Sequence, residues 1–234
     1  MNKSRFKPIR KFHKLTGYLL ALQIFAWLLG GLVMSAIPLE MVHGKHLAKR
    51  ALDNPFSQTD YRADLNHLAR SVNGFNTLTF SHFLDQPMII ASGEEHAYFT
   101  ATGAPFPAPT EAQIRANAQA HFLGDSPVDS AQLLSTGPRE VQYRPHIWQV
   151  TFADTLSTTL YLDALSGQVI TVRSTLWRIF DFFWMLHIMD YDERDDFNNP
   201  LLITFAASSV AFCLSGMLLL FQSPPWRRRR QHAR

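Results

Sequence analysis

Three histidines are the residues of this chain with the clearest chemical potential. His13, His43 and His187 each lie near the end of a long apolar run. Imidazole nitrogens are common ligands of metal ions and of haem iron. Histidine beside tryptophan and tyrosine is also an ordinary packing residue where a helix meets a membrane surface. The sequence therefore leaves two interpretations open, a ligand role and a packing role.

His187 lies on a predicted helix with one aromatic face. Trp177, Phe180, Trp184, His187 and Tyr191 recur at steps of three and four residues. This spacing places them on one side of an α-helix. We therefore expect an amphipathic helix over residues 175–191 that lies at the membrane interface, with His187 on its aromatic face.

An acidic run follows this predicted helix. Its members are Asp190, Asp192, Glu193, Asp195 and Asp196. Carboxylates are ligands that hard cations prefer, yet a run of like charges is also typical of a solvated turn. We expect the solvated turn here, outside the membrane, because Asn198, Asn199 and Pro200 separate the run from the second apolar segment.

Two uncharged segments, 15–39 and 201–223, are each long enough to cross a bilayer, which takes about 20 apolar residues. The first is too long for the apolar core of a signal peptide, so we expect it to be retained. Basic tails, 1–14 and 224–234, flank the two segments on their outer sides. The positive-inside rule then predicts that both ends are cytoplasmic and that the chain is anchored in the lipid bilayer.

Charge and cysteine content narrow the function classes. The chain has a net charge of +3, but the basic residues gather beside the apolar runs, which favours membrane topology over nucleic-acid binding. The single cysteine, Cys213, allows no disulfide within the chain and no thiolate metal cluster. The nucleotide-binding and zinc-protease motifs with fixed spacing are also missing from the sequence.

The central segment, 40–173, reads as an α+β domain with two similar halves, about 57–103 and 110–173. In each half a helical pattern precedes short alternating segments typical of antiparallel strands. Thr110 is the expected helix cap of the second half, and Ser166-Gly167 the expected hairpin turn. The expected strands are 77–84, 88–92, 97–101, 140–143, 146–152, 158–163 and 168–173.

The closing strands of this segment resemble those of a PepSY domain. The stretch IWQVTFADTLSTTLYLDALSGQVITV holds a Tyr-x-Asp-x-x-x-Gly turn at Tyr161, Asp163 and Gly167. The stretch RKFHKLTGYLLALQIFAWLLGGLVM, with His13 and Gly17, is similar to the first helix of PepSY-associated transmembrane proteins. Segment LHIMDYDERDDFNNPLL resembles the stretch before a later helix of that group. Larger members have four membrane helices, whereas this chain has two predicted ones.

The resemblance implies a bacterial inner-membrane protein with a periplasmic domain, related to ferric-siderophore reductases. It implies transmembrane electron transfer through haem b towards a periplasmic ferric chelate such as a ferric siderophore. His43 and His187 would ligate one iron at the external side, with Trp177, Phe180 and Trp184 on the porphyrin. His13 lies about 45 Å from His43 if the helix is continuous, so it would serve a second iron.

Two helices form a thin sheath for a haem, so this hypothesis needs a homodimer or a membrane redox partner. The competing hypothesis is a non-enzymatic binding, regulatory or assembly subunit that acts through its periplasmic domain. The remaining external histidines are expected to be solvated; they are His46, His67, His82, His96, His121 and His146. We also expect Gln23 and Ser215 to meet between the two membrane helices, because polar side chains in hydrocarbon need partners.

Overall fold

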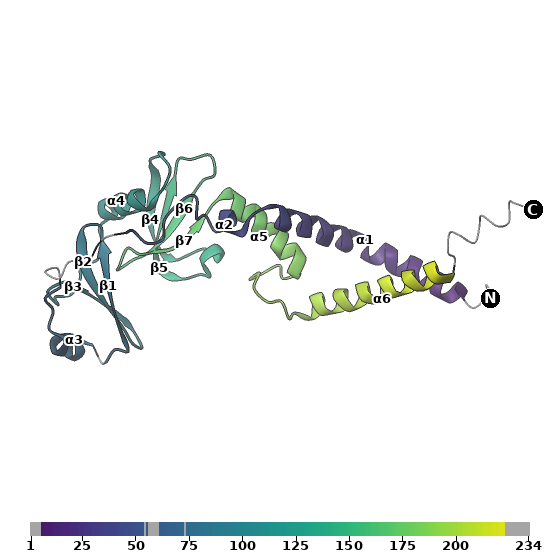
Figure 1. Cartoon of the computed structure of the whole chain (residues 1–234), viewed down its shortest axis with the longest axis horizontal. Helices are drawn as coiled ribbons and strands as arrows, with labels where there is room; N and C mark the ends of the chain where they lie inside the picture. Colours follow the sequence, from purple (N-terminus) through teal and green to yellow (C-terminus); the bar gives the residue numbers. More distant parts are fainter. Residues whose placement is uncertain (1–5, 54, 56–60, 73, 223–234) are drawn as a thin grey trace, which may run out of the picture. The chain divides into compact units, whose positions relative to one another are not determined.

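The structure, a computed structural model, describes residues 6–53, 55, 61–72 and 74–222 (Figure 1). The fold is α+β and divides into two compact units at Ile37/Pro38 and Ile179/Phe180. We name the part up to Ile37 and from Phe180 onward the helix unit, and Pro38–Ile179 the sheet unit. The end of the basic tail at 1–5 and the whole tail at 224–234 lie outside the described residues.

The helix unit contains two long apolar helices, as the sequence predicts. Helix α1 is Lys7–Ala36 and helix α6 is Pro200–Gln222, and the two pack against each other. In the most apolar window, 11% of α1 and 6% of α6 is buried. A core helix of a soluble protein would be mostly buried, so these helices expose apolar surface that suits a lipid environment.

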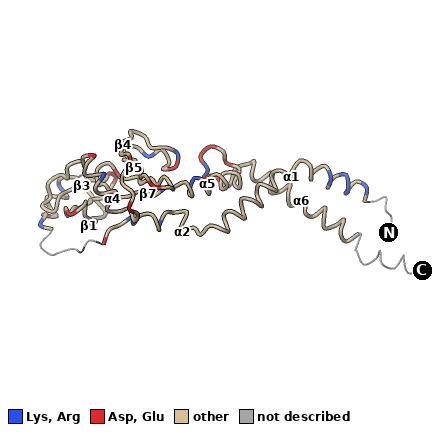
Figure 2. Tube along the Cα trace, turned by 90° about the horizontal axis from the view of Figure 1, so that it is seen from above, with Lys and Arg blue, Asp and Glu red and all other residues tan. Residues whose placement is uncertain are grey.

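The first helix starts earlier than its uncharged segment. It begins at Lys7 with Pro8 in its first turn, where the missing N–H of proline costs nothing. The basic residues from Lys7 to Lys14 therefore lie on its first two turns, and Figure 2 shows them gathered at that end of α1. The helix ends at Ala36, two residues before Pro38, because the residue before proline disfavours helical backbone.

Helix α5, Thr175–Ile188, is shorter than the expected 175–191. Met189 follows it with a positive φ of 55°, so the chain turns before Tyr191. In the helix unit, the Gln23 side chain donates a hydrogen bond to the carbonyl oxygen of Leu186 at 3.1 Å. A Cβ at Gly30 would lie 3.5 Å from the carbonyl oxygen of Phe183. The second half of α5 therefore packs along the middle of α1.

The first half of the sheet unit is a three-stranded antiparallel meander with strand order β1-β2-β3. Helix α2, Leu39–Val42, and helix α3, Leu65–Ser71, precede it. Its strands are β1 (Thr77–Phe83), β2 (Gln86–Ser92) and β3 (His96–Thr100). Leu68 of α3 packs with Ile89, Ala91 and Phe99 in a small apolar core.

The second half is a helix followed by a four-stranded antiparallel sheet with strand order β4-β5-β6-β7. Helix α4, Glu111–His121, begins with a capping box between Thr110 and Gln113, as the sequence predicts for Thr110. The strands are β4 (Val128–Thr136), β5 (Pro145–Phe152), β6 (Thr159–Asp163) and β7 (Val169–Arg173). Ile114 and Ala118 of α4 pack on this sheet to form the main core.

The two halves thus share a helix-and-meander plan, but the strand predictions need two corrections in the second half. The expected strand at 140–143 is wrong, because Arg139–Val141 is a 3₁₀ helix followed by left-handed Gln142 and Tyr143. Strand β4 was not expected, because its sequence VDSAQLLST mixes polar residues with too few β-branched ones to give a clear pattern.

Gly167 lies where the two halves of the sheet unit meet. It adopts a φ of +67° in the turn between β6 and β7, and a Cβ there would lie 2.2 Å from the Phe83 ring. Phe83 belongs to β1 yet is buried in the main core. The buried Asn117 side chain donates a hydrogen bond to the Gly167 carbonyl oxygen at 2.8 Å. Glycine is required here by both backbone conformation and space.

Replacing Gly167 with alanine tests this junction. We expect Gly167→Ala to lower the free energy of unfolding by about 2 kcal/mol, because the new methyl group collides with a fully buried ring. The matched control is Leu165→Ala in the same turn, where the side chain is exposed. Chemical denaturation of the detergent-solubilised chain measures both. Equal, small changes in the two variants would contradict the packing described here.

Candidate functional site

His13 is held firmly between the two long helices. Its Nδ1 lies 2.8 Å from Oγ of the buried Ser215, and its ring stacks flat on Phe212 at 4.3 Å. Ser215 donates its own proton to the Phe212 carbonyl oxygen, so its oxygen accepts from an Nδ1–H of His13. A Cβ at Gly216 would lie 3.0 Å from His13 Cε1. The expected Gln23–Ser215 contact is wrong, since each side chain takes another partner.

His187 of α5 packs beside Trp27 of α1. The two ring centroids are 6.0 Å apart. Within the described part of the chain, Nδ1 of His187 and Nε1 of Trp27 are buried and have no hydrogen-bond partner. A buried polar atom without a partner is uncommon, because it loses the hydrogen bonds that water would supply. This orphaned nitrogen is the feature that keeps a ligand role open for His187.

A haem held by two histidines of one chain does not fit the helix unit. His13 and Trp27, the neighbour of His187, are fourteen positions apart on α1, or about 21 Å along its axis. Two imidazoles on one iron must face each other across a single ring. His13 and His187 are the histidines among the described residues of this unit, so neither has a histidine partner there.

Two of the three aromatic residues expected on a porphyrin, Trp177 and Trp184, have protein partners. Trp184 donates its Nε1–H to the Arg194 carbonyl oxygen at 3.1 Å. Trp177 is covered by the guanidinium of Arg173, 4.2 Å from the ring centroid. Both tryptophans are therefore explained by packing within their own units.

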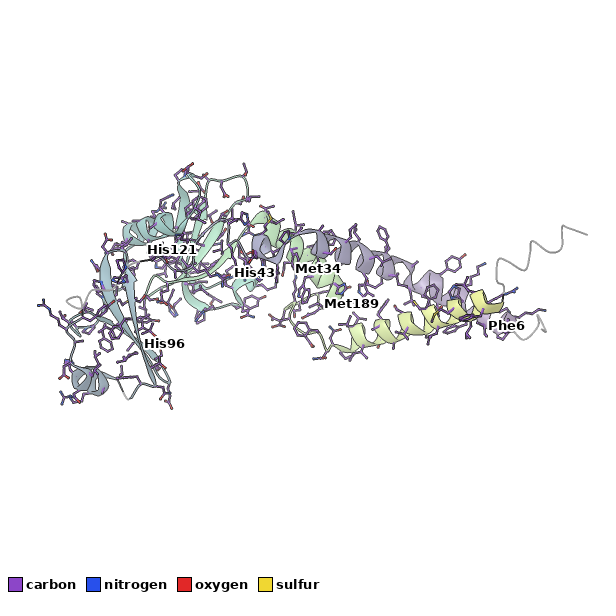
Figure 3. The ribbon with its side chains drawn as sticks, viewed as in Figure 1. Phe6, Met34, His43, His96, His121 and Met189 are labelled. Carbon is purple, nitrogen blue, oxygen red and sulfur yellow. The ribbon has the colours of Figure 1, made fainter. Side chains whose placement is uncertain are left out.

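His43 lies in the sheet unit just after α2, and Figure 3 labels it. Burial, followed by the charges of Arg50, Arg173 and Lys45, lowers the pKa of His43 below its usual value. The imidazole is therefore neutral near pH 7, which is the form that binds metals. Its neighbours are mostly cationic, whereas a haem site in a membrane protein needs an apolar sheath.

The acidic run after α5 caps its own backbone. Oδ2 of Asp190 accepts from the backbone N–H groups of Asp195 and Asp196, both at 3.1 Å. Arg194 forms an ion pair with the buried Asp181 of α5. No group of three or more potential ligand side chains that could hold a metal ion occurs in the described residues. The turn is explained by these internal bonds.

The sheet unit contains a cavity of about 560 Å³ that sequence reasoning missed. It lies beside the Gly167 turn, and its volume falls within the usual range for small-ligand sites, about 300–1,000 Å³. We name it the His121 cavity. The polar residues that line it are Arg50, Asp53, Ser81, His82, Asn117, His121 and Gln168.

His121 is the best-defined titratable group of this cavity. The prediction that it is solvated is wrong, because it is 7% exposed and faces the core side of α4 (Figure 3). Its Nδ1 lies 2.6 Å from the Lys49 carbonyl oxygen and donates to it, which leaves Nε2 as an acceptor. Burial lowers its pKa, and the hydrogen bond to Lys49 partly offsets that effect.

The segment that holds His121 is itself fixed by backbone bonds. The Lys49 N–H donates to the His121 carbonyl oxygen at 2.9 Å, and the Leu123 N–H donates to the Leu47 carbonyl oxygen at 2.9 Å. We name residues 47–53 the strap. The sequence signal for His121 was its spacing from Ile114, Asn117 and Ala118, which puts all four on one face of α4.

Comparison of the chain with protein-family models, with curated proteins and with solved structures finds no match. The resemblance to PepSY proteins therefore rests on the sequence stretches alone, and the site must be judged from its own geometry.

Acidification should destabilise the sheet unit through His121. Its pKa is lower in the folded chain than in the unfolded one, so between the two values the unfolded chain binds more protons. This contribution to stability is present above about pH 6.5 and is lost as the pH falls through the folded pKa. Denaturation curves between pH 7.5 and about pH 5 measure the change.

The variant His121→Gln should flatten this pH dependence, since glutamine cannot titrate in that range and can still donate to Lys49. His82→Gln, which changes the other cavity histidine, is the matched control and should keep the dependence. An unchanged slope in His121→Gln would contradict the assignment.

Proposed function

We propose that the chain is a membrane-anchored binding protein whose sheet unit faces away from the cytoplasm. The anchoring part rests on α1 and α6, which are apolar, long and exposed along their length. Basic residues lie at the start of α1 and after α6, which favours an N-in, C-in arrangement. In a bacterial inner membrane, this arrangement puts the sheet unit in the periplasm.

The His121 cavity is the observation that carries the binding function. It combines an acceptor nitrogen on His121, a cation on Arg50 and a carboxylate on Asp53. Such a lining suits a small polar ligand with hydroxyl or carboxylate groups, because each kind of ligand group finds a partner of opposite character. A ferric chelate of a hydroxy acid belongs to this class, and it is the ligand that the sequence resemblance favours.

Binding of ferric citrate to the full chain in detergent tests this function. Isothermal titration calorimetry of the wild-type chain should give a saturable signal, and His82→Phe should weaken the affinity at least about tenfold, because it removes the hydrogen-bonding nitrogens of a side chain that lines the cavity. The matched control is His96→Phe, an exposed histidine of β3 outside this cavity, which should bind like the wild type.

Iron-free citrate separates two forms of the proposal. Binding of citrate alone with the same dependence on His82 supports an anion site and removes iron from the ligand class. Absence of saturable binding by both compounds, or equal binding by His82→Phe and the wild type, would overturn the cavity as the ligand site.

Electron transfer through haem b is a second candidate, in a homodimer or with a membrane redox partner. The buried, unpartnered Nδ1 of His187 favours it, because a metal–nitrogen bond would satisfy that atom. His13, whose Nδ1–H is fixed by Ser215, keeps Nε2 in the tautomer that ligates metals. A bound haem b would supply one-electron transfer, and the second ligand of each iron would have to come from outside the described residues of the helix unit.

An absorption spectrum of the purified full chain, expressed with ample haem, tests this candidate. We expect a Soret band that His187→Ala or His13→Ala weakens, because each removes one axial ligand. The control is His67→Ala on α3, an exposed histidine of the sheet unit. A spectrum without a Soret band would overturn electron transfer through haem and leave the binding function as it stands.

A further inference from the structure

A second hollow of the sheet unit, about 450 Å³, is also lined by residues of the strap. We name it the basic hollow. Its lining is His43, Lys45, Ala48, Lys49, Arg50, Ala51 and Asp53. It shares Arg50, Ala51 and Asp53 with the His121 cavity, whereas the two lysines belong to the basic hollow alone. Neither the binding function nor the haem candidate uses these lysines.

The backbone that carries the cations is held in place by the core. Gly44 has a φ of +70°, and a Cβ there would lie 2.7 Å from a methyl carbon of the buried Val172. Ala48 is buried and pairs with Phe122 in an isolated β-bridge. Lys45 and Lys49 each directly follow one of these anchor points, Gly44 and Ala48. Both side chains are more than half exposed, and Lys49 pairs with Asp53 at 3.4 Å as Lys45 pairs with Glu40 at 3.0 Å.

Positive charge dominates this hollow. Three cations line it, Lys45, Lys49 and Arg50, against the single carboxylate of Asp53. Lys45 also pairs with Glu40, but both side chains are more than half exposed, and such surface pairs contribute about 1 kcal/mol at most. Burial is the main cause of the lowered pKa of His43, and the charges of Arg50, Arg173 and Lys45 add to it, which is consistent with a positive potential at this point. A bound anion would reduce the repulsion among the three cations.

Only a short stretch of chain separates the basic hollow from the end of α1. His43 follows Ala36 by seven residues, which span about 25 Å at most. Leu39 and Met41 lie between them on α2, and both are exposed apolar side chains. A phospholipid has a charged phosphate group and apolar chains. The cations of the basic hollow suit the phosphate, and the exposed apolar residues of α2 near the candidate membrane span suit the chains.

We propose that the basic hollow binds the phosphate group of a membrane phospholipid, with Leu39 and Met41 against the apolar part of the same lipid. Lys45, Lys49 and Arg50 supply the charges that the phosphate meets. The inference rests on the proposed role of α1 as a membrane anchor and does not require a ligand in the His121 cavity.

The test uses the full chain in a neutral detergent and measures the thermal unfolding midpoint. Phosphatidylglycerol should raise the midpoint of the wild type more than phosphatidylcholine does. In the double variant Lys45→Gln/Lys49→Gln most of that difference should be lost. The matched control Arg70→Gln removes an exposed cation from α3, outside the hollow, and should behave like the wild type. All three chains keep their basic cytoplasmic residues, so lipid bound there cancels in the comparison.

Native mass spectrometry of the same samples should show at least one phosphatidylglycerol fewer on the double variant. An equal midpoint rise and equal lipid occupancy in the double variant and the wild type would overturn the proposal. A rise with inorganic phosphate as large as with the lipid would also overturn it and would identify a free phosphate site. His82→Phe should keep the lipid effect, so a failure of the His121 cavity leaves this result unaffected.

Discussion

The approach of Phe83 to Gly167 is the contact on which the sheet unit depends. It lets an aromatic ring from the three-stranded half enter the core of the four-stranded half, where no side chain other than hydrogen fits at position 167. Asn117 binds the carbonyl oxygen of the same residue, so α4 is fixed to the same point. The His121 cavity lies beside this contact, with Gly167 and Asn117 in its wall. A small change in that turn therefore affects both folding and the shape of the site.

The helix unit is organised by a different constraint, the scarcity of polar partners between apolar helices. His13, Gln23 and Ser215 each find a hydrogen-bond partner, and small residues at Gly30 and Gly216 allow the close approach that this requires. His187 and Ser209 have buried polar atoms without partners in the described structure. The hydrogen bond to Ser215 accounts for Nδ1 of His13, whereas Nδ1 of His187 has no partner in the described structure.

Much of the fold follows from the sequence, because its strongest signals are local. Uncharged runs predict α1 and α6, and Thr110 with Gln113 predicts the start of α4. The ends of the helices are harder to predict. Helix α1 begins at Lys7, before the uncharged segment at 15–39, because lysine and arginine are good helix formers. The cavity could not be predicted, because its residues come from the strap, β1, α4 and the Gly167 turn. Nothing in their separate stretches indicates that they meet.

The strap that lines both hollows has a thermodynamic consequence. Arg50, Ala51 and Asp53 belong to both linings, so a displacement of this segment changes the shape of both hollows. If an occupant of one hollow favours one position of the strap, its binding free energy is linked to that of an occupant of the other hollow. Linkage of this kind is reciprocal, so each occupant changes the affinity of the other by the same factor. One short segment thereby makes two separate hollows a single coupled system.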